Sequence, residues 1–274
     1  MSKASPIRNK LAEASALIRS GRSKEAIPIL DRIIEAGPDS SFALAQGVRV
    51  NFPLAERGRA KLFSGDYQGA MADFSEMIRK WPANPEGYTC RARARKTVGD
   101  FQGAVDDYSS AISLNPKHPF AYLVRGGMKV LLGDLCGAIE DFTSGMENDP
   151  MGRLTGLLNR GKTKYLLGDL SGAIADLTEA ISLEHAGPVF APLFRGRAKL
   201  AAGDCEGAIS DFTAAINGFP RLTNAYRHRA EAKALAGDQK GADDDLMRYN
   251  ELGGRDLPAY AWPGDDDFLT VTHT

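Results

Sequence analysis

The chain has 274 residues, of which 43% are hydrophobic and 25% are charged, and both values are ordinary for a globular protein. Its 34 lysines and arginines nearly balance 35 acidic residues, and a formal net charge of -1 counts against a nucleic-acid-binding protein. No run of about 18 apolar residues predicts a membrane span, and Glu13, Arg19 and Arg22 interrupt any secretion signal. We therefore expect a cytoplasmic protein.

A degenerate ten-residue signature, GRSKEAIPIL, begins at Gly21 and returns in six fuller copies. In these copies Gly-Asp, two variable residues, Gly-Ala and an acidic residue lead to an aromatic residue or a leucine. They read GDYQGAMADF, GDFQGAVDDY, GDLCGAIEDF, GDLSGAIADL, GDCEGAISDF and GDQKGADDDL, starting at Gly65, Gly99, Gly133, Gly168, Gly203 and Gly237. The intervals of 34, 34, 35, 35 and 34 residues indicate a structural repeat.

The spacing predicts seven helix-turn-helix repeats within a solenoid domain at residues 1–256. Their ranges are 7–40, 51–84, 85–118, 119–152, 154–187, 189–222 and 223–256. Residues 41–50 (SFALAQGVRV) form an insertion, which we expect to be a helical stretch that breaks near Pro53. Residues 257–274 form a separate acidic and aromatic tail.

Each constant position of the signature has a physical role. The leading glycine tolerates the left-handed backbone that ends a first helix, and the aspartate after it caps the second helix. The alanine five residues after the glycine lets two helices approach, and the large residue at nine fills the space between them. The proline at seventeen ends the second helix in most copies. Since one helix pair cannot bury its apolar face alone, the repeats must stack.

This period and these positions resemble the tetratricopeptide repeat (TPR), in its bacterial type, over roughly residues 7–256. The resemblance implies an all-α fold, an α-solenoid wound as a right-handed superhelix with a concave groove. It also implies a non-catalytic scaffold or adaptor for protein-protein interaction, which grips a peptide segment in that groove.

Two ladders of charge run through the last six copies, with an arginine eight residues before each glycine and an aspartate eight residues after it. The pairs are Arg57 and Asp73, Arg91 and Asp107, Arg125 and Asp141, Arg160 and Asp176, Arg195 and Asp211, and Arg229 and Asp245. On a helical wheel these arginines point about 160° away from the groove-facing position six residues before the glycine. We therefore predict structural ion pairs between the helices, with a polybasic ligand track as the alternative.

The groove-facing offsets predict an apolar surface that also carries cations, and such a surface suits a partner with apolar and acidic residues. The predicted peptide-binding residues are Arg59, Phe63, Arg93, Phe120, Leu123, Val124, Leu131, Asn159, Lys162, Tyr165, Phe190, Phe194, Arg197, Arg227 and His228. The alternative for any one apolar residue is packing between repeats. The Lys and Asn clamp of TPR chaperone adaptors is not supported, because only Asn159 stands at a suitable offset.

The tail leaves three alternatives open. Tyr260 and Trp262 could cap the exposed end of the last repeat, because terminal repeats need covering. Alternatively, Trp262, the aspartates at 265–267, Phe268 and Leu269 could dock in the chain's own groove or in that of a second copy, giving self-association. The third alternative is disorder.

Chemistry beyond binding is not indicated. The sequence has no HExxH motif, phosphate loop or nucleophile elbow, and its three cysteines lack metal-site spacing, so we expect no enzyme, cofactor or metal. The function alternatives are a small-ligand or peptide-signal sensor acting as a regulatory subunit, and an assembly or secretion chaperone. RNA binding, as in related helical repeats, is disfavoured by the net charge.

Overall fold

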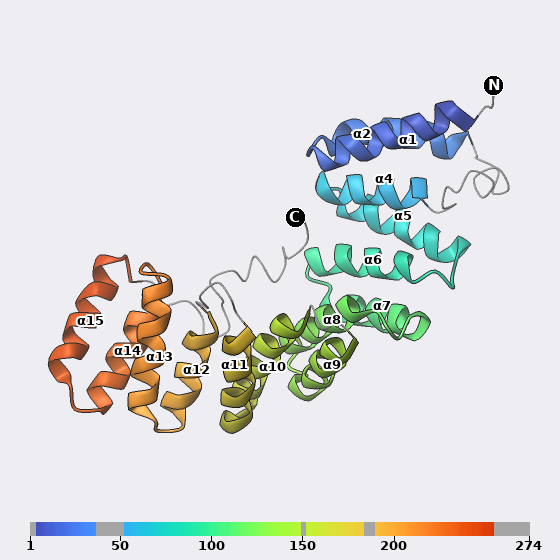
Figure 1. Cartoon of the computed structure of the whole chain (residues 1–274). Helices are drawn as coiled ribbons and strands as arrows, with labels where there is room; N and C mark the ends of the chain where they lie inside the picture. The colour runs from blue at the N-terminus through green and yellow to red at the C-terminus, as the bar shows by residue number, and fades with distance from the viewer. Residues whose placement is uncertain (1–3, 37–51, 149–151, 184–189, 255–274) are drawn as a thin grey trace. The chain divides into compact units, whose positions relative to one another are not determined.

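The computed structural model describes residues 4–36, 52–148, 152–183 and 190–254, and every regular element within them is helical (Figure 1). The helices are α1 (Ala4–Arg19), α2 (Ser23–Glu35), α4 (Phe52–Phe63), α5 (Tyr67–Lys80), α6 (Pro85–Thr97), α7 (Phe101–Leu114), α8 (Pro119–Leu131), α9 (Leu135–Asn148), α10 (Arg153–Leu167), α11 (Leu170–Leu183), α12 (Phe190–Ala201), α13 (Cys205–Gly218), α14 (Thr223–Leu235) and α15 (Gln239–Glu251). The predicted all-α fold is confirmed. The insertion at 41–50 and the tail at 257–274 lie outside the described residues.

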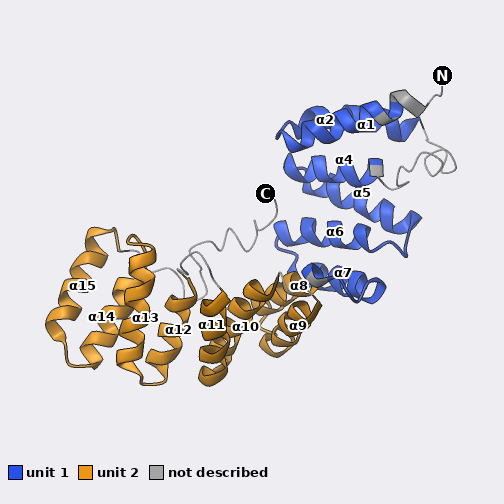
Figure 2. Ribbon diagram, in the orientation of Figure 1, with its two compact units in different colours: residues 1–121 blue, residues 122–274 orange. Residues whose placement is uncertain are grey.

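The chain divides into two compact units, residues 1–121 and residues 122–274, with the boundary inside α8 (Figure 2). In unit 1, α1, α2, α4, α5, α6 and α7 pack in sequence order, each helix on the next. In unit 2, α9 to α15 pack in the same way, and the first helices α10, α12 and α14 also contact one another. This neighbour-to-neighbour packing is that of an α-solenoid.

The turn between the two helices of a repeat follows from its Gly-Asp pair. Gly65 has a φ of 87°, a left-handed conformation that strains other residues. The carboxylate of Asp66 then accepts a hydrogen bond of 2.9 Å from the backbone N–H of Gly69 and caps α5. A Cβ atom at Gly69 would lie 2.1 Å from that carboxylate, which explains the second glycine of the signature.

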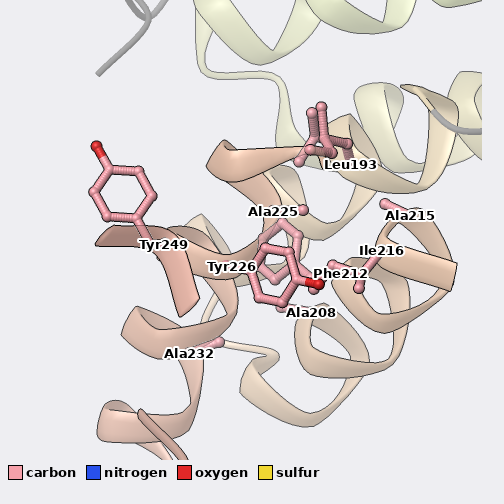
Figure 3. Close-up of a cluster of buried hydrophobic side chains, with 10 residues drawn as sticks. Leu193, Ala208, Phe212, Ala215, Ile216, Ala225, Tyr226, Ala232 and Tyr249 are labelled. Atoms are coloured by element: carbon pink, nitrogen blue, oxygen red, sulfur yellow. The ribbon is translucent and has the colours of Figure 1, made fainter. Parts of the chain in front are cut away.

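The core forms where two positions of the signature meet, the alanine five residues after the glycine and the large residue nine residues after it. The alanines five residues after each glycine are 0–1% exposed, at Ala26, Ala70, Ala104, Ala138, Ala173, Ala208 and Ala242. The large residues at nine are equally buried in the first six repeats, at Leu30, Phe74, Tyr108, Phe142, Leu177 and Phe212. Figure 3 shows one such cluster, in which Phe212 and Tyr226 lie among small side chains from α13 and α14. No described helix is long and apolar enough to cross a bilayer.

Candidate binding face of the first helices

The ladder arginines and aspartates meet in pairs inside each repeat. Arg125 donates from Nε and Nη2 to the two carboxylate oxygens of Asp141, at 2.8 and 2.6 Å. The Asp141 side chain is only 4% exposed, so the fork holds a buried charge. The same two-bond geometry joins Arg57 to Asp73, Arg91 to Asp107, Arg160 to Asp176, Arg195 to Asp211 and Arg229 to Asp245. These arginines hold the two helices of a repeat together.

A second cation shares each of these carboxylates. Lys129, one helical turn after Arg125, places Nζ 3.1 Å from Asp141 Oδ2. The other residues of this column are Lys61, Arg95, Lys164, Lys199 and Lys233. Burial raises the pKa of Asp245, but hydrogen bonds from Arg229 and Lys233 outweigh it and bring that pKa below its ordinary value.

A third contact, which the sequence reasoning missed, joins at least five of the six ladder arginines to the preceding repeat. Arg160 Nη1 donates to Thr143 Oγ1 at 3.0 Å, and Thr143 belongs to the second helix of the repeat before. Equivalent bonds join Arg57 to Asp31, Arg91 to Ser75, Arg195 to Thr178 and Arg229 to Thr213. The signal was present in the sequence, because the residue ten after each glycine is Asp, Ser or Thr until the last repeat.

In unit 1 the predicted face contains a neutralised cation. Arg59 on α4 donates to Glu56 at 2.5 Å and to Glu86 on α6 at 2.7 Å. Arg93 is half-buried, whereas Phe63 and Phe120 expose 52% and 36% of their surface. Because two carboxylates already engage Arg59, this residue contributes little net attraction for an acidic ligand.

In unit 2 the structure brings two cations of the predicted face over the same aromatic ring. Lys162 Nζ on α10 lies 5.7 Å from the centre of the Phe194 ring, and Arg197 Cζ on α12 lies 5.6 Å from it. Arg197 also lies 5.1 Å from the centre of the Tyr165 ring. Such cation-π contacts stabilise positive side chains at fixed positions on a surface. We call this group the unit 2 cationic cluster.

Several predicted residues of unit 2 are less exposed than a binding surface requires. Phe194 and Asn159 are each only 3% exposed, so they pack between repeats. Leu123 and Val124 are half-buried, as is Phe190, while Leu131 is 54% exposed. The side-chain nitrogen Nδ2 of Asn159 has no hydrogen-bond partner in the described part of the chain.

His228 on α14 reports the electrostatic character of this region. Its ring stacks on Phe212 with 5.7 Å between the ring centres and 26° between the planes. Burial lowers the pKa of His228 to about 4, and the positive charges of Arg197 and Arg227 add to this effect. His228 is therefore neutral at neutral pH beside two guanidinium groups.

No protein-family profile matches the chain, and no curated protein matches it in sequence. Solved structures do resemble it. The C-terminal part of a TPR repeat-containing protein from Cytophaga hutchinsonii is 15% identical with a TM-score of 0.69, over 90% of this chain and 96% of that one. A tetratricopeptide repeat protein from Parabacteroides merdae is 17% identical with a TM-score of 0.64, over 96% and 97%.

A third similar structure is YrrB, described as a TPR protein with an unusual peptide-binding site. It is 18% identical with a TM-score of 0.56, over 72% of this chain and 95% of that one. At these identities the likeness concerns the fold. The helix pairs, the signature and these neighbours together show that the chain has a TPR-type helical repeat fold.

Proposed function

We propose that this protein is a non-catalytic scaffold or adaptor, and that its unit 2 cationic cluster binds a peptide segment rich in carboxylates and aromatic side chains. The observation that carries this proposal is the placement of Lys162 and Arg197, from two successive repeats, over the ring of Phe194. Neither cation belongs to the two columns that hold the ladder carboxylates, because Arg160 and Lys164 hold Asp176, and Arg195 and Lys199 hold Asp211.

Charge selects the ligand class. Lys162, Arg197 and Arg227 stand on the successive first helices α10, α12 and α14, and Arg197 and Arg227 add to the lowering of the His228 pKa that burial causes. A positive potential of this kind favours carboxylates, and arginine can hold a carboxylate through two hydrogen bonds.

Aromatic and apolar surface supplies the second half of the recognition. Tyr165 is half-buried beneath Arg197, and Leu131 and Leu166 expose 54% and 37% of their surface. Aromatic ligand side chains gain from contact with both rings and cations. The peptide-binding site named for YrrB, a protein of the same fold, supports a peptide as the ligand.

The test uses a fluorescently labelled peptide in which aspartate alternates with phenylalanine, titrated with the full chain and followed by anisotropy. A matched peptide with asparagine in place of aspartate should bind much more weakly. Arg197→Gln should reduce affinity about tenfold, as truncation of an arginine at the centre of an interface does. Equal binding of the two peptides would show that the cationic cluster does not recognise carboxylates.

Arg195 offers a matched control on the same helix. It lies two residues before Arg197 but holds Asp211 at 2.9 and 2.6 Å. Arg195→Gln should lower the melting temperature and leave the affinity of the folded protein for the peptide unchanged. Arg197→Gln should lower the affinity and leave the melting temperature unchanged. The predicted cytoplasmic location stays a prediction.

A further inference from the structure

The last described helix, α15, exposes a large side chain at a position of the repeat that is buried in every earlier repeat. The large residue nine positions after the signature glycine is 0–1% exposed in the first six repeats. In the last repeat this residue is Leu246, and it is 41% exposed. Elsewhere the following repeat covers this position, as α14 covers Phe212. On α15 the surface that a following repeat would cover is therefore apolar and open.

The next position along the helix, ten residues after the signature glycine, also changes from polar to apolar in the last repeat. Ten residues after the glycine stand polar side chains that accept a hydrogen bond from the arginine of the next repeat, at Asp31, Ser75, Thr143, Thr178 and Thr213. In the last repeat this position is Met247, which is 59% exposed. A flexible apolar side chain replaces the acceptor, so the surface suits an apolar occupant and not another arginine ladder.

The backbone that leaves α15 differs from that of the second helices α5 and α13. The residues that follow α5 and α13, Trp81 and Phe219, have φ of -135° and -143°. By contrast, Gly253, two residues after the end of α15, has φ 90°, and the N–H of Gly254 donates to the carbonyl of Tyr249 at 3.0 Å. This is the turn found at Gly65, which directs the chain back along the helix that it has just left.

The sequence after this turn repeats an interval of the signature. Trp262 follows Gly253 by nine residues, as Phe74 follows Gly65. Leu246 precedes Gly253 by seven residues, as Gly58 precedes Gly65. In that earlier repeat the two positions touch, since a Cβ atom at Gly58 would lie 2.5 Å from the Phe74 ring. Trp262 thus stands at the sequence interval at which the earlier repeat carries a large core side chain.

Distance permits the contact. Leu246 lies about 12 Å along α15 from Gly254, at 1.5 Å per residue. The residues from 255 to 262 can span more than this distance even when they are not fully extended, at about 3.3 Å per residue. The segment from 255 to 274 is therefore long enough to reach the open surface of its own chain.

We propose that residues 255–274 dock on α15 of their own chain, with the Trp262 ring against Leu246 and Met247. The occupant is this segment because it leaves α15 by a reversing turn and carries a large aromatic side chain at the matching interval. The docked segment supplies the apolar cover that the last repeat otherwise lacks. This proposal is independent of peptide binding by the unit 2 cationic cluster.

The test uses tryptophan fluorescence of the full chain. The sequence has two tryptophans, Trp81 and Trp262, so Trp81→Phe leaves Trp262 as the single reporter. We expect Trp262 to emit at shorter wavelength in the folded protein than in urea. Adding Met247→Glu should shift the emission toward the urea value, because it places a charge against the ring. In a second measurement, Trp262→Ala should speed oxidation of Met247 by hydrogen peroxide.

Leu235→Glu is the matched control, because Leu235 is 67% exposed but lies on α14. It should leave the emission of Trp262 unchanged. A solvent-exposed emission in the parent would overturn the proposal, and so would a short-wavelength emission that Met247→Glu does not move. Emission that shifts on dilution would assign the surface to a second copy and would also overturn it.

Discussion

Arg195 on α12 holds Asp211 on α13 through two hydrogen bonds of 2.9 and 2.6 Å, and the carboxylate lies buried between the helices. Two residues further along α12, Arg197 lies over the rings of Tyr165 and Phe194. One helix thus carries an arginine that holds its own repeat together and another that faces a ring from the repeat before. We expect the first kind of contact to determine stability and the second to determine binding.

Removal of one ladder arginine should destabilise the stack. Arg125→Ala leaves Asp141 buried with Lys129 as its only remaining cation of the two ladder columns, and loss of one partner from a buried pair costs about 3 kcal/mol. Thermal melting followed by circular dichroism should show a lower transition temperature. Arg221→Ala removes an exposed arginine outside the ladder and serves as the control, which should melt near the parent. Equal melting of the two variants would contradict a structural role for the ladder.

The single hydrogen bond that joins a ladder arginine to the preceding repeat, as Arg229 is joined to Thr213, should contribute less to stability. Thr213→Val keeps the shape of the side chain but removes the acceptor for Arg229 Nη1, which lies 3.1 Å away. We expect a loss of about 1 kcal/mol, as for one hydrogen bond. Thr97→Val is the comparison, because the Thr97 hydroxyl bonds only to the carbonyl of Arg93 on its own helix. Urea unfolding of both variants would show whether Thr213 costs more than Thr97.

Substitutions of Gly69 and of the capping residue Asp66 should have non-additive effects on the free energy of unfolding. Gly69→Ala places a Cβ atom 2.1 Å from the carboxylate of Asp66, so this substitution should destabilise the parent. In an Asp66→Ala background the clash is absent, and Gly69→Ala should then stabilise α5 by about 1 kcal/mol through helix propensity. The measurement is a double-mutant cycle by urea unfolding. Additive effects would show that the glycine has another role.

The first repeat supports this coupling without any substitution. There Arg22 replaces the aspartate and Glu25 replaces the second glycine, and no side chain caps α2. Instead Arg22 donates to Glu25 at 2.7 and 2.6 Å. The two positions therefore change together within this one chain, as the steric argument requires.

The pKa of His228 should report the positive potential of unit 2. An NMR titration of the imidazole should give an apparent pKa of about 4, against an ordinary value of 6.5. Arg197→Gln should raise this pKa because it removes a nearby positive charge. An unchanged pKa in that variant would show that burial alone causes the shift.

The same shift has a consequence for stability. Because the folded-state pKa is lowered, the unfolded chain binds a proton at His228 more readily than the folded chain. The contribution of His228 is therefore fully present above pH 6.5 and is lost as the pH falls toward 4. In His228→Phe, which keeps a ring against Phe212, this part of the acid destabilisation should be absent, so the difference in melting temperature between parent and variant should change as the pH falls from 6.5 to 4.

Much of this architecture can be predicted from the sequence alone. The turn at Gly65 and the cap from Asp66 depend on residues a few positions apart, and so their chemistry is visible in the sequence. The ladder pair of Arg125 and Asp141 is separated by sixteen residues, but its sixfold recurrence reveals it. The hydroxyl of Thr143 could have been found in the same way, because its column is also regular.

Only the tertiary structure decided which side chains of the predicted face are accessible and which charges are already neutralised. Arg59 is engaged by Glu86 from the next first helix, and Phe194 is buried although its offset places it on the expected groove. Leu246 is exposed although its offset predicts a core residue. These outcomes depend on side chains from other repeats in columns that vary, whereas the sequence alone determines the helices and turns, because those arise from local backbone chemistry repeated seven times.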